Sequence, residues 1–278
     1  MAQPFEQRIL ITTVILDALT ITVGLVAAYM HLNHGHTGML SIRQLGWAPI
    51  PILVIIPILF AAIATKYEEL LHRVLRVMLV FGLTLGAFFV FQHMFDSWVM
   101  LTTVLIAFIA MTFLKCLCTQ NLAIIIGVAG IAALLGLYMS PFVAFVILIL
   151  SAIYDMIFVY GSSRMARVAT EMFHANSVFG LVVPERPAGW WMSTTQALGS
   201  SNVMILGSGD IGLPLMFAVS ILPTSLRGAI VVSLFTLLGV ALLHWLFFRR
   251  KLKIPVAALP PIVACTVVGY AIVLLTGL

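Results

Sequence analysis

The chain has 278 residues, of which 63% are hydrophobic and only 8% are charged. A soluble domain of this length would carry about a quarter charged residues, so most of this surface must face lipid. The net charge of +5 does not indicate nucleic-acid binding, because phosphate contacts need basic side chains gathered on one polar face, which this sequence lacks. The composition predicts a multi-pass integral membrane protein.

Nine apolar stretches follow one another along the chain. Each is long enough, or nearly so, for a membrane-spanning helix of about 20 residues. The break between the fifth and the sixth rests on the Met139-Ser140-Pro141 turn, since proline suits the first turn of a helix. We therefore predict an all-α fold with nine transmembrane helices, over residues 9–31, 45–64, 74–92, 98–114, 122–138, 141–161, 202–222, 228–247 and 254–277.

This pattern divides the chain into three parts. Residues 1–163 hold the first six helices, residues 164–201 form a long loop, and residues 202–278 hold the last three helices. The loop contains an apolar segment from Val178 to Pro184. Loops of this length are often lids or binding loops, but a linker without function fits the sequence equally well.

Basic residues predict the orientation of the helices. If nine helices alternate, one side of the membrane carries 12 of the 14 Lys and Arg residues, and the positive-inside rule makes that side cytoplasmic. The N-terminus and the 164–201 loop are then cytoplasmic, and the C-terminus lies outside. The 12 residues are Arg8, Lys66, Arg73, Arg76, Lys115, Arg164, Arg167, Arg186, Arg249, Arg250, Lys251 and Lys253.

Three acidic residues lie inside the predicted helices, namely Asp17, Asp155 and Asp210. An ionisable group at such depth is costly and usually marks function. Each lies nine residues from the cytoplasmic end of its helix, which corresponds to roughly 13 Å at the rise of an α-helix. All three could therefore meet at one level of the bundle.

Two facing carboxylates in a site of low dielectric cannot both ionise comfortably, so such a pair shares one proton. This arrangement drives aspartic proteases, in which the ionised partner activates water and the protonated one polarises the carbonyl. A proton relay in a transporter could use the same pair. The carboxylates alone do not discriminate between these functions.

The residues before Asp210 form the sequence Gly207-Ser208-Gly209. Two glycines let another backbone approach closely and weaken the helix there, as a protease needs if a helical substrate is to unwind beside the acid. Glycine is also common in plain packing of membrane helices. The local pattern leaves both interpretations open.

Three short motifs together resemble the signatures of the presenilin and signal peptide peptidase family of intramembrane aspartyl proteases. Tyr154-Asp155, Gly207-Ser208-Gly209-Asp210 and Ala258-Leu259-Pro260 are similar to its Tyr-Asp, Gly-x-Gly-Asp and Pro-Ala-Leu motifs. They occur in order on the sixth, seventh and ninth predicted helices, and the helix count extends the resemblance to the whole chain. Ser208 stands where presenilins usually have Leu, and Ala257 replaces the first Pro of the third motif.

The resemblance implies that Asp155 and Asp210 form the catalytic dyad. It places Tyr154, Gly207, Ser208, Gly209, Ala258, Leu259 and Pro260 at the substrate cleft. No metal or cofactor is expected, and neither is nucleic acid. The substrates would be single-span membrane proteins.

The orientation predicted from charge is that of the presenilin branch, whereas signal peptide peptidases are inverted. Short loops suggest a microbial relative in the plasma membrane. Nothing indicates accessory subunits, and a homo-oligomer is compatible with the sequence.

Two rival functions use the same residues. A proton-coupled transporter could employ the aspartates as a relay, although such carriers usually show repeats and paired broken helices, which are not visible here. A membrane scaffold without catalysis would leave three buried acids unexplained. We expect Asp17, which the family does not explain, to be a neutral structural acid that hydrogen-bonds to a neighbouring hydroxyl or backbone group, with Thr12, Thr13 and Thr20 on its own helix as possible partners.

Overall fold

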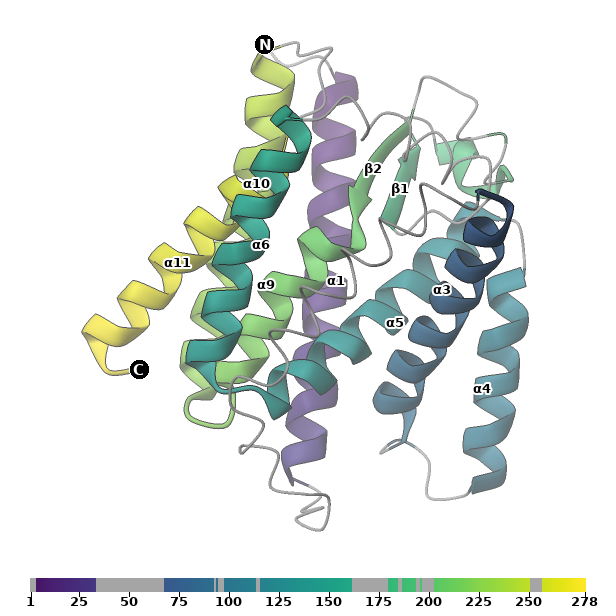
Figure 1. The fold of residues 1–278 in the computed structure, drawn as a ribbon, viewed down its shortest axis with the longest axis horizontal. Helices are drawn as coiled ribbons and strands as arrows, with labels where there is room; N and C mark the ends of the chain where they lie inside the picture. The colour runs from purple at the N-terminus through teal and green to yellow at the C-terminus, as the bar shows by residue number, and fades with distance from the viewer. Residues whose placement is uncertain are drawn as a thin grey trace.

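The computed structural model of the protein is mostly helical (Figure 1). It describes residues 4–33, 68–92, 94, 98–113, 116–161, 180–184, 187–193, 196, 203–250 and 257–278. Within these ranges lie eight α-helices: α1 (Pro4–Asn33), α3 (Glu68–Phe91), α4 (Trp98–Phe113), α5 (Leu117–Tyr138), α6 (Pro141–Gly161), α9 (Ser208–Ile221), α10 (Leu226–Arg250) and α11 (Leu259–Thr276).

Each of the eight helices lies on one of the nine apolar stretches. The stretch at 45–64 falls outside the described residues. Four helices are long and apolar enough to cross a membrane, over Gln7–Asn33, Leu117–Tyr138, Leu226–Leu246 and Leu259–Thr276. The helical membrane class is thus supported, while the number of nine spans stays a prediction.

The predicted break between the fifth and sixth helices is confirmed. α5 ends at Tyr138 and α6 begins at Pro141. The hydroxyl oxygen of Ser140 accepts a hydrogen bond from the Val143 N–H at 3.3 Å, and its carbonyl accepts one from the Ala144 N–H at 3.0 Å. Ser140 therefore caps the first turn of α6, where an N–H has no partner inside the helix.

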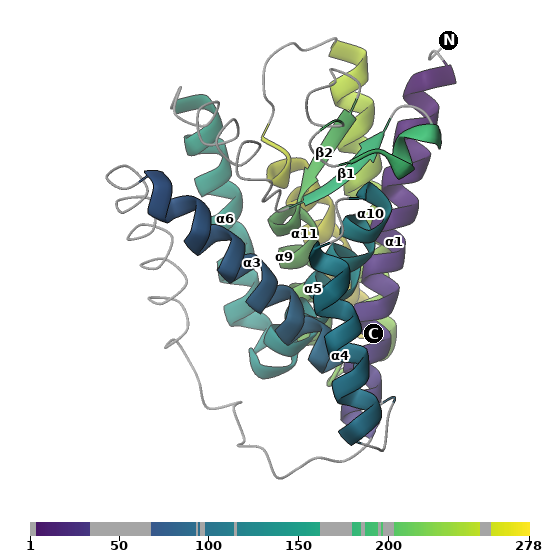
Figure 2. The same cartoon turned by 90° about the vertical axis from the view of Figure 1, so that its right-hand side faces the viewer.

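Helix α9 is the central element of the fold. It packs against α1, α5, α6, α10 and α11 (Figures 1 and 2). Every residue from Pro214 to Ile221 is buried, and the side chains of Phe217 and Val219 are completely covered. A helix that is apolar all round and buried all round can only form at the centre of a bundle. Because α9 is enclosed by other helices, its packing fixes the position of an acidic residue in its first turn.

The prediction of an all-α fold is wrong in one respect. Two short strands, β1 (Gly180–Pro184) and β2 (Val203–Gly207), form an antiparallel sheet in which Gly180 pairs with Gly207 and Pro184 with Val203. The helix predicted from residue 202 therefore begins only at Ser208. The run from Val203 to Leu206 is apolar enough to extend a helix, but its pairing with the earlier strand from Leu181 to Pro184 holds it extended.

The strand β1 lies within the segment predicted as a loop at 164–201. Leu181, Val182 and Val183 are almost completely buried. A short 3₁₀ helix, η2 (Pro187–Trp191), follows and contacts both β1 and α5. This part of the segment is thus a packed element, and β2 leads without a break into α9.

Candidate active site

Helices α6 and α9 bring two of the three buried acids together. Asp155 lies in the second half of α6, and Asp210 lies in the first turn of α9. Helices α6 and α9 pack against each other, and the two carboxyl groups are near enough for their charges to interact. Both side chains are partly buried. The pair is therefore close enough for the two carboxyl groups to influence each other's proton, as acid–base chemistry requires.

The N-terminus of α11 holds Asp155. The backbone N–H of Leu259 donates a hydrogen bond to Asp155 Oδ2 at 3.1 Å, and the backbone of Ala258 acts on the same carboxyl group. Pro260 and Pro261, in the first turn of α11, carry no N–H. The first N–H groups of a helix have no partner inside it and favour a negative charge. The predicted Ala258-Leu259-Pro260 segment thus contacts the dyad through its main chain.

Gly207 leaves room for the carboxylate of Asp210. A Cβ atom at Gly207 would lie 3.0 Å from Asp210 Oδ2, and the Gly207 backbone also interacts with this carboxyl group. A side chain at this position would press on the acid. The first glycine of the motif therefore lets Asp210 keep its position without being displaced.

Gly209 is in a different environment. A Cβ atom there would meet no atom within 4 Å in the described part of the chain, and the residue is exposed. The space beside Asp210 is open at this point.

The other predicted cleft residues lie on the same elements. Ser208 is the first residue of α9 and is partly buried. Tyr154 is 53% exposed and shares its stretch of α6 with the exposed Ile153 and Met156. Tyr154 directly precedes Asp155 in the sequence.

Asn121 on α5 is a residue that the sequence analysis missed. Its side chain is 2% exposed and binds the main chain of Val182 in β1, with Nδ2 donating to the Val182 carbonyl at 2.7 Å and Oδ1 accepting from the Val182 N–H at 2.9 Å. The predicted fifth helix began at residue 122 and so excluded it. An amide one position before an apolar run was the signal that could have found it.

Asp17 does not join the dyad in the described structure. It is completely buried on α1, and neither carboxyl oxygen has a hydrogen-bond partner within the described ranges. The hydroxyls of Thr13 and Thr20 donate instead to the carbonyls of Ile9 and Leu16 on their own helix. The predicted hydrogen bond to a neighbouring hydroxyl or backbone group is therefore wrong for the described structure.

Replacing Asp17 with leucine should stabilise the protein. A buried polar group without a partner costs about 1–3 kcal/mol, and leucine removes that cost while filling a similar volume. We expect Asp17→Leu to raise the midpoint of thermal unfolding in detergent, whereas Asp17→Asn, which keeps a polar group, should not. Proteolysis by Asp17→Leu should stay above a tenth of the wild-type rate. A folded Asp17→Leu protein without activity would make Asp17 a third functional acid.

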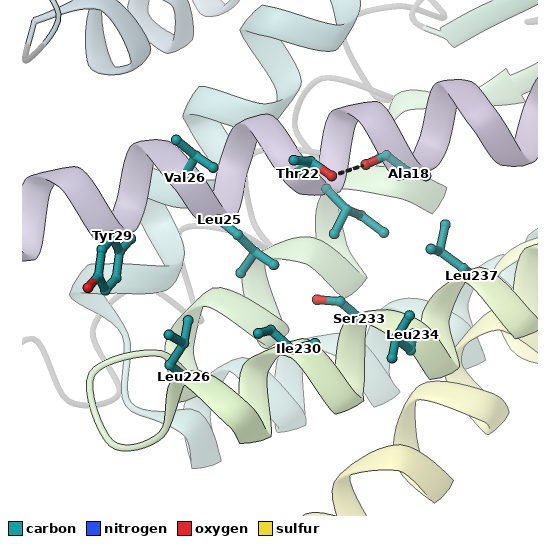
Figure 3. Close-up of a pocket in the computed structure, with 11 residues that line it drawn as sticks. Ala18, Thr22, Leu25, Val26, Tyr29, Leu226, Ile230, Ser233, Leu234 and Leu237 are labelled. Carbon is teal, nitrogen blue, oxygen red and sulfur yellow. Dashed lines mark hydrogen bonds between the residues drawn. The ribbon is translucent and has the colours of Figure 1, made fainter.

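An apolar groove of about 390 Å³ lies between α1 and α10 (Figure 3). Its walls are side chains of α1 between Ala18 and Tyr29 and of α10 between Leu226 and Leu237. The Thr22 hydroxyl donates to the Ala18 carbonyl at 2.7 Å and is thereby used within its own helix. Neither member of the dyad lines this groove, so we do not assign the chemistry to it.

Metal-binding residues do not cluster in the described part of the chain, where no three His, Cys, Asp or Glu side chains lie close enough to hold an ion. The groups that the described structure gathers around the dyad are the two carboxyl groups and the backbone N–H groups of Gly207 and Leu259.

Comparison with known proteins gives the class of this fold and site. The family model described as signal-peptide peptidase, presenilin aspartyl protease matches residues 10–277. The chain therefore belongs to the family of presenilin and signal peptide peptidase aspartyl proteases.

A solved structure of a presenilin family intramembrane aspartate protease, in space group C222, has a similar fold. The TM-score is 0.62 at 18% sequence identity, and the match covers 95% of this chain and 97% of the other. No curated protein sequence matches. The resemblance inferred from the three motifs is thus confirmed at the level of the family.

Proposed function

We propose that the protein is an intramembrane aspartyl endopeptidase that cleaves transmembrane segments of membrane proteins. One observation carries the proposal. Asp155 and Asp210 come from two apolar helices that pack against each other, and the first turn of a third helix holds one of them. Membership of the aspartyl protease family supports the same function.

In this proposal the dyad works by acid–base chemistry with one shared proton. The ionised carboxylate takes a proton from a water molecule as that water attacks the scissile carbonyl carbon. The protonated partner donates a hydrogen bond to the carbonyl oxygen, where negative charge develops. The Leu259 N–H keeps Asp155 oriented during these steps. No metal or cofactor takes part.

The register of the sheet supports a route for the substrate. Val182 pairs with Ile205, and both main-chain groups of Val182 bond to Asn121 rather than to β2. In an antiparallel ladder, when the N–H and C=O of one residue point away from the partner strand, those of the residue paired with it also point away. Ile205 therefore presents its main-chain groups at the far edge of β2, and so do Val203 and Gly207, two residues to either side.

This edge of β2 leads to the dyad. Within the described ranges, no further strand pairs with β2, and the outward-facing Gly207 interacts with Asp210. An extended peptide that adds to this edge as a third strand would pass directly beside the carboxylate. A helical substrate segment would unwind to do so, because its N–H groups must leave their helical partners before they can pair with β2.

The orientation that we propose is the one predicted from charge, with the N-terminus and the 164–201 segment in the cytoplasm of a microbial cell. Substrates would then be single-span segments with their N-terminus outside. A topology reporter fused near Arg43 or at the C-terminus should report an extracytoplasmic location, and one fused between Arg164 and Arg186 a cytoplasmic one. The reverse pattern would assign the protein to the signal-peptide-peptidase orientation and invert the direction of its substrates.

The test of this function uses the purified protein in detergent or liposomes with a single-span reporter substrate. We expect cleavage that a transition-state analogue of aspartyl proteases blocks. The rival function, a proton-coupled transporter, has no support in the family or the fold. It would gain support if the same preparation acidified liposomes and left the reporter intact.

A further inference from the structure

The carboxamide of Asn121 holds one residue of β1 in the way that a neighbouring strand would. It offers one donor and one acceptor, and it uses both on Val182, at 2.7 and 2.9 Å. The two residues are 61 positions apart in the chain. Asn121 therefore acts as a one-residue third strand on the outer edge of β1.

The outer edge of β1 has three residues whose main-chain groups point away from β2. They are Gly180, Val182 and Pro184, because these alternate in the ladder with Leu181 and Val183. Asn121 occupies both groups of Val182. Pro184 has no N–H to offer. An incoming strand thus finds the centre of this edge filled and one end without a donor.

The opposite edge of the sheet differs. In the part of the chain that the structure describes, no hydrogen bond joins the outward N–H or C=O of Ile205 to another group. A sheet with one blocked edge and one unblocked edge accepts a new strand on one side only. The side left available is the one that ends at Gly207 and Asp210.

We propose that Asn121 is a positioning residue for proteolysis, which closes the β1 edge and ties β1 to α5 so that an extended substrate pairs only with β2 in a single register. This inference rests on the proposed proteolytic function. It explains why a buried amide stands at the start of an apolar helix. It also links α5, which carries no member of the dyad, to the choice of the bond that is cleaved.

The test compares Asn121→Leu, which removes both hydrogen bonds, with Asn121→Asp, whose carboxylate can accept from Val182 but cannot donate. Cleavage positions in a single-span reporter are mapped by mass spectrometry, and kcat/KM and the binding of a small transition-state analogue are measured. Val143→Ala is the matched control, since it opens a cavity at a buried position on α6 and leaves β1 untouched.

We expect Asn121→Leu to spread cleavage over neighbouring bonds and to lower kcat/KM for the main bond at least about tenfold. Asn121→Asp should give a smaller change in the same direction. Binding of the small analogue should stay within about threefold of wild type, because it needs the dyad and not the sheet. Val143→Ala should lose stability and keep the wild-type cleavage pattern. If Asn121 only stabilised the fold, Asn121→Leu should behave in the same way.

A folded Asn121→Leu protein that cleaves the same bonds in the same proportions, at the wild-type kcat/KM, would overturn the inference. If Asn121→Leu does not fold, Asn121→Asp decides by the same cleavage map. Failure of the proposed function would look different. The wild-type protein itself would then leave the reporter intact and would not bind the analogue.

Discussion

Replacing either Asp155 or Asp210 with asparagine should abolish proteolysis while the protein stays folded. Asparagine keeps the shape of the side chain, but it can neither take a proton from water nor share one with its partner. Acid–base catalysis by one positioned group contributes about 10²–10⁴-fold, and here both steps depend on one shared proton. We therefore expect turnover of a single-span reporter to fall at least about 10³-fold in each variant.

The two variants should also be non-additive. Because the two carboxyl groups act as a unit, the double variant should be no slower than either single one. Thermal unfolding in detergent checks that each protein is folded, and Asp17→Asn serves as the control, because Asp17 is a buried acid outside the dyad. Wild-type turnover in either single variant would show that the dyad is assigned wrongly.

Replacing Ile205 with proline should impair cleavage strongly and leave the sheet intact. The N–H of Ile205 points away from β1, so proline removes a donor at the outer edge without breaking a bond of the ladder. Without this donor, a carbonyl group of the bound substrate would have no hydrogen-bond partner, and an unsatisfied polar group of this kind costs about 1–3 kcal/mol. We expect kcat/KM for a transmembrane substrate to fall about 10- to 100-fold.

Two controls separate loss of the outer edge from loss of the strand. Ile205→Val keeps the N–H and should retain most of the activity. Met204→Pro removes an N–H that faces β1 and should destabilise the sheet itself. A folded Ile205→Pro protein with the kcat/KM of the wild type would rule out addition of the substrate along β2.

The described helices of this fold were predictable because each lies on an apolar run, although several of their first residues were not. The break at Ser140-Pro141 was found to within a residue, since capping and the fixed backbone of proline are local effects. The two aspartates were found because an acid in an apolar run stands out in any reading of the sequence. Their pairing was implied by the resemblance to the family, because equal depth alone would have included Asp17.

The strands were not predictable in the same way. Val203 to Leu206 is an apolar run that continues into α9, and only its partner at Leu181 to Pro184 makes it a strand. The hydrogen bonds of Asn121 depend on a residue 61 positions away. The environment of Asp17 was misjudged for a related reason, because the threonines beside it satisfy their hydroxyls on their own helix.

The most direct test of the central claim is the fate of the water oxygen in a cleaved transmembrane segment. The wild-type protein is placed in liposomes with a single-span reporter in water enriched in ¹⁸O, and the products are analysed by mass spectrometry. We predict two fragments that meet within the apolar segment, with ¹⁸O in the new carboxyl terminus, and neither fragment with Asp155→Asn or Asp210→Asn. A reporter left intact by the wild-type protein, or cut equally by the dyad variants, would contradict the proposed function.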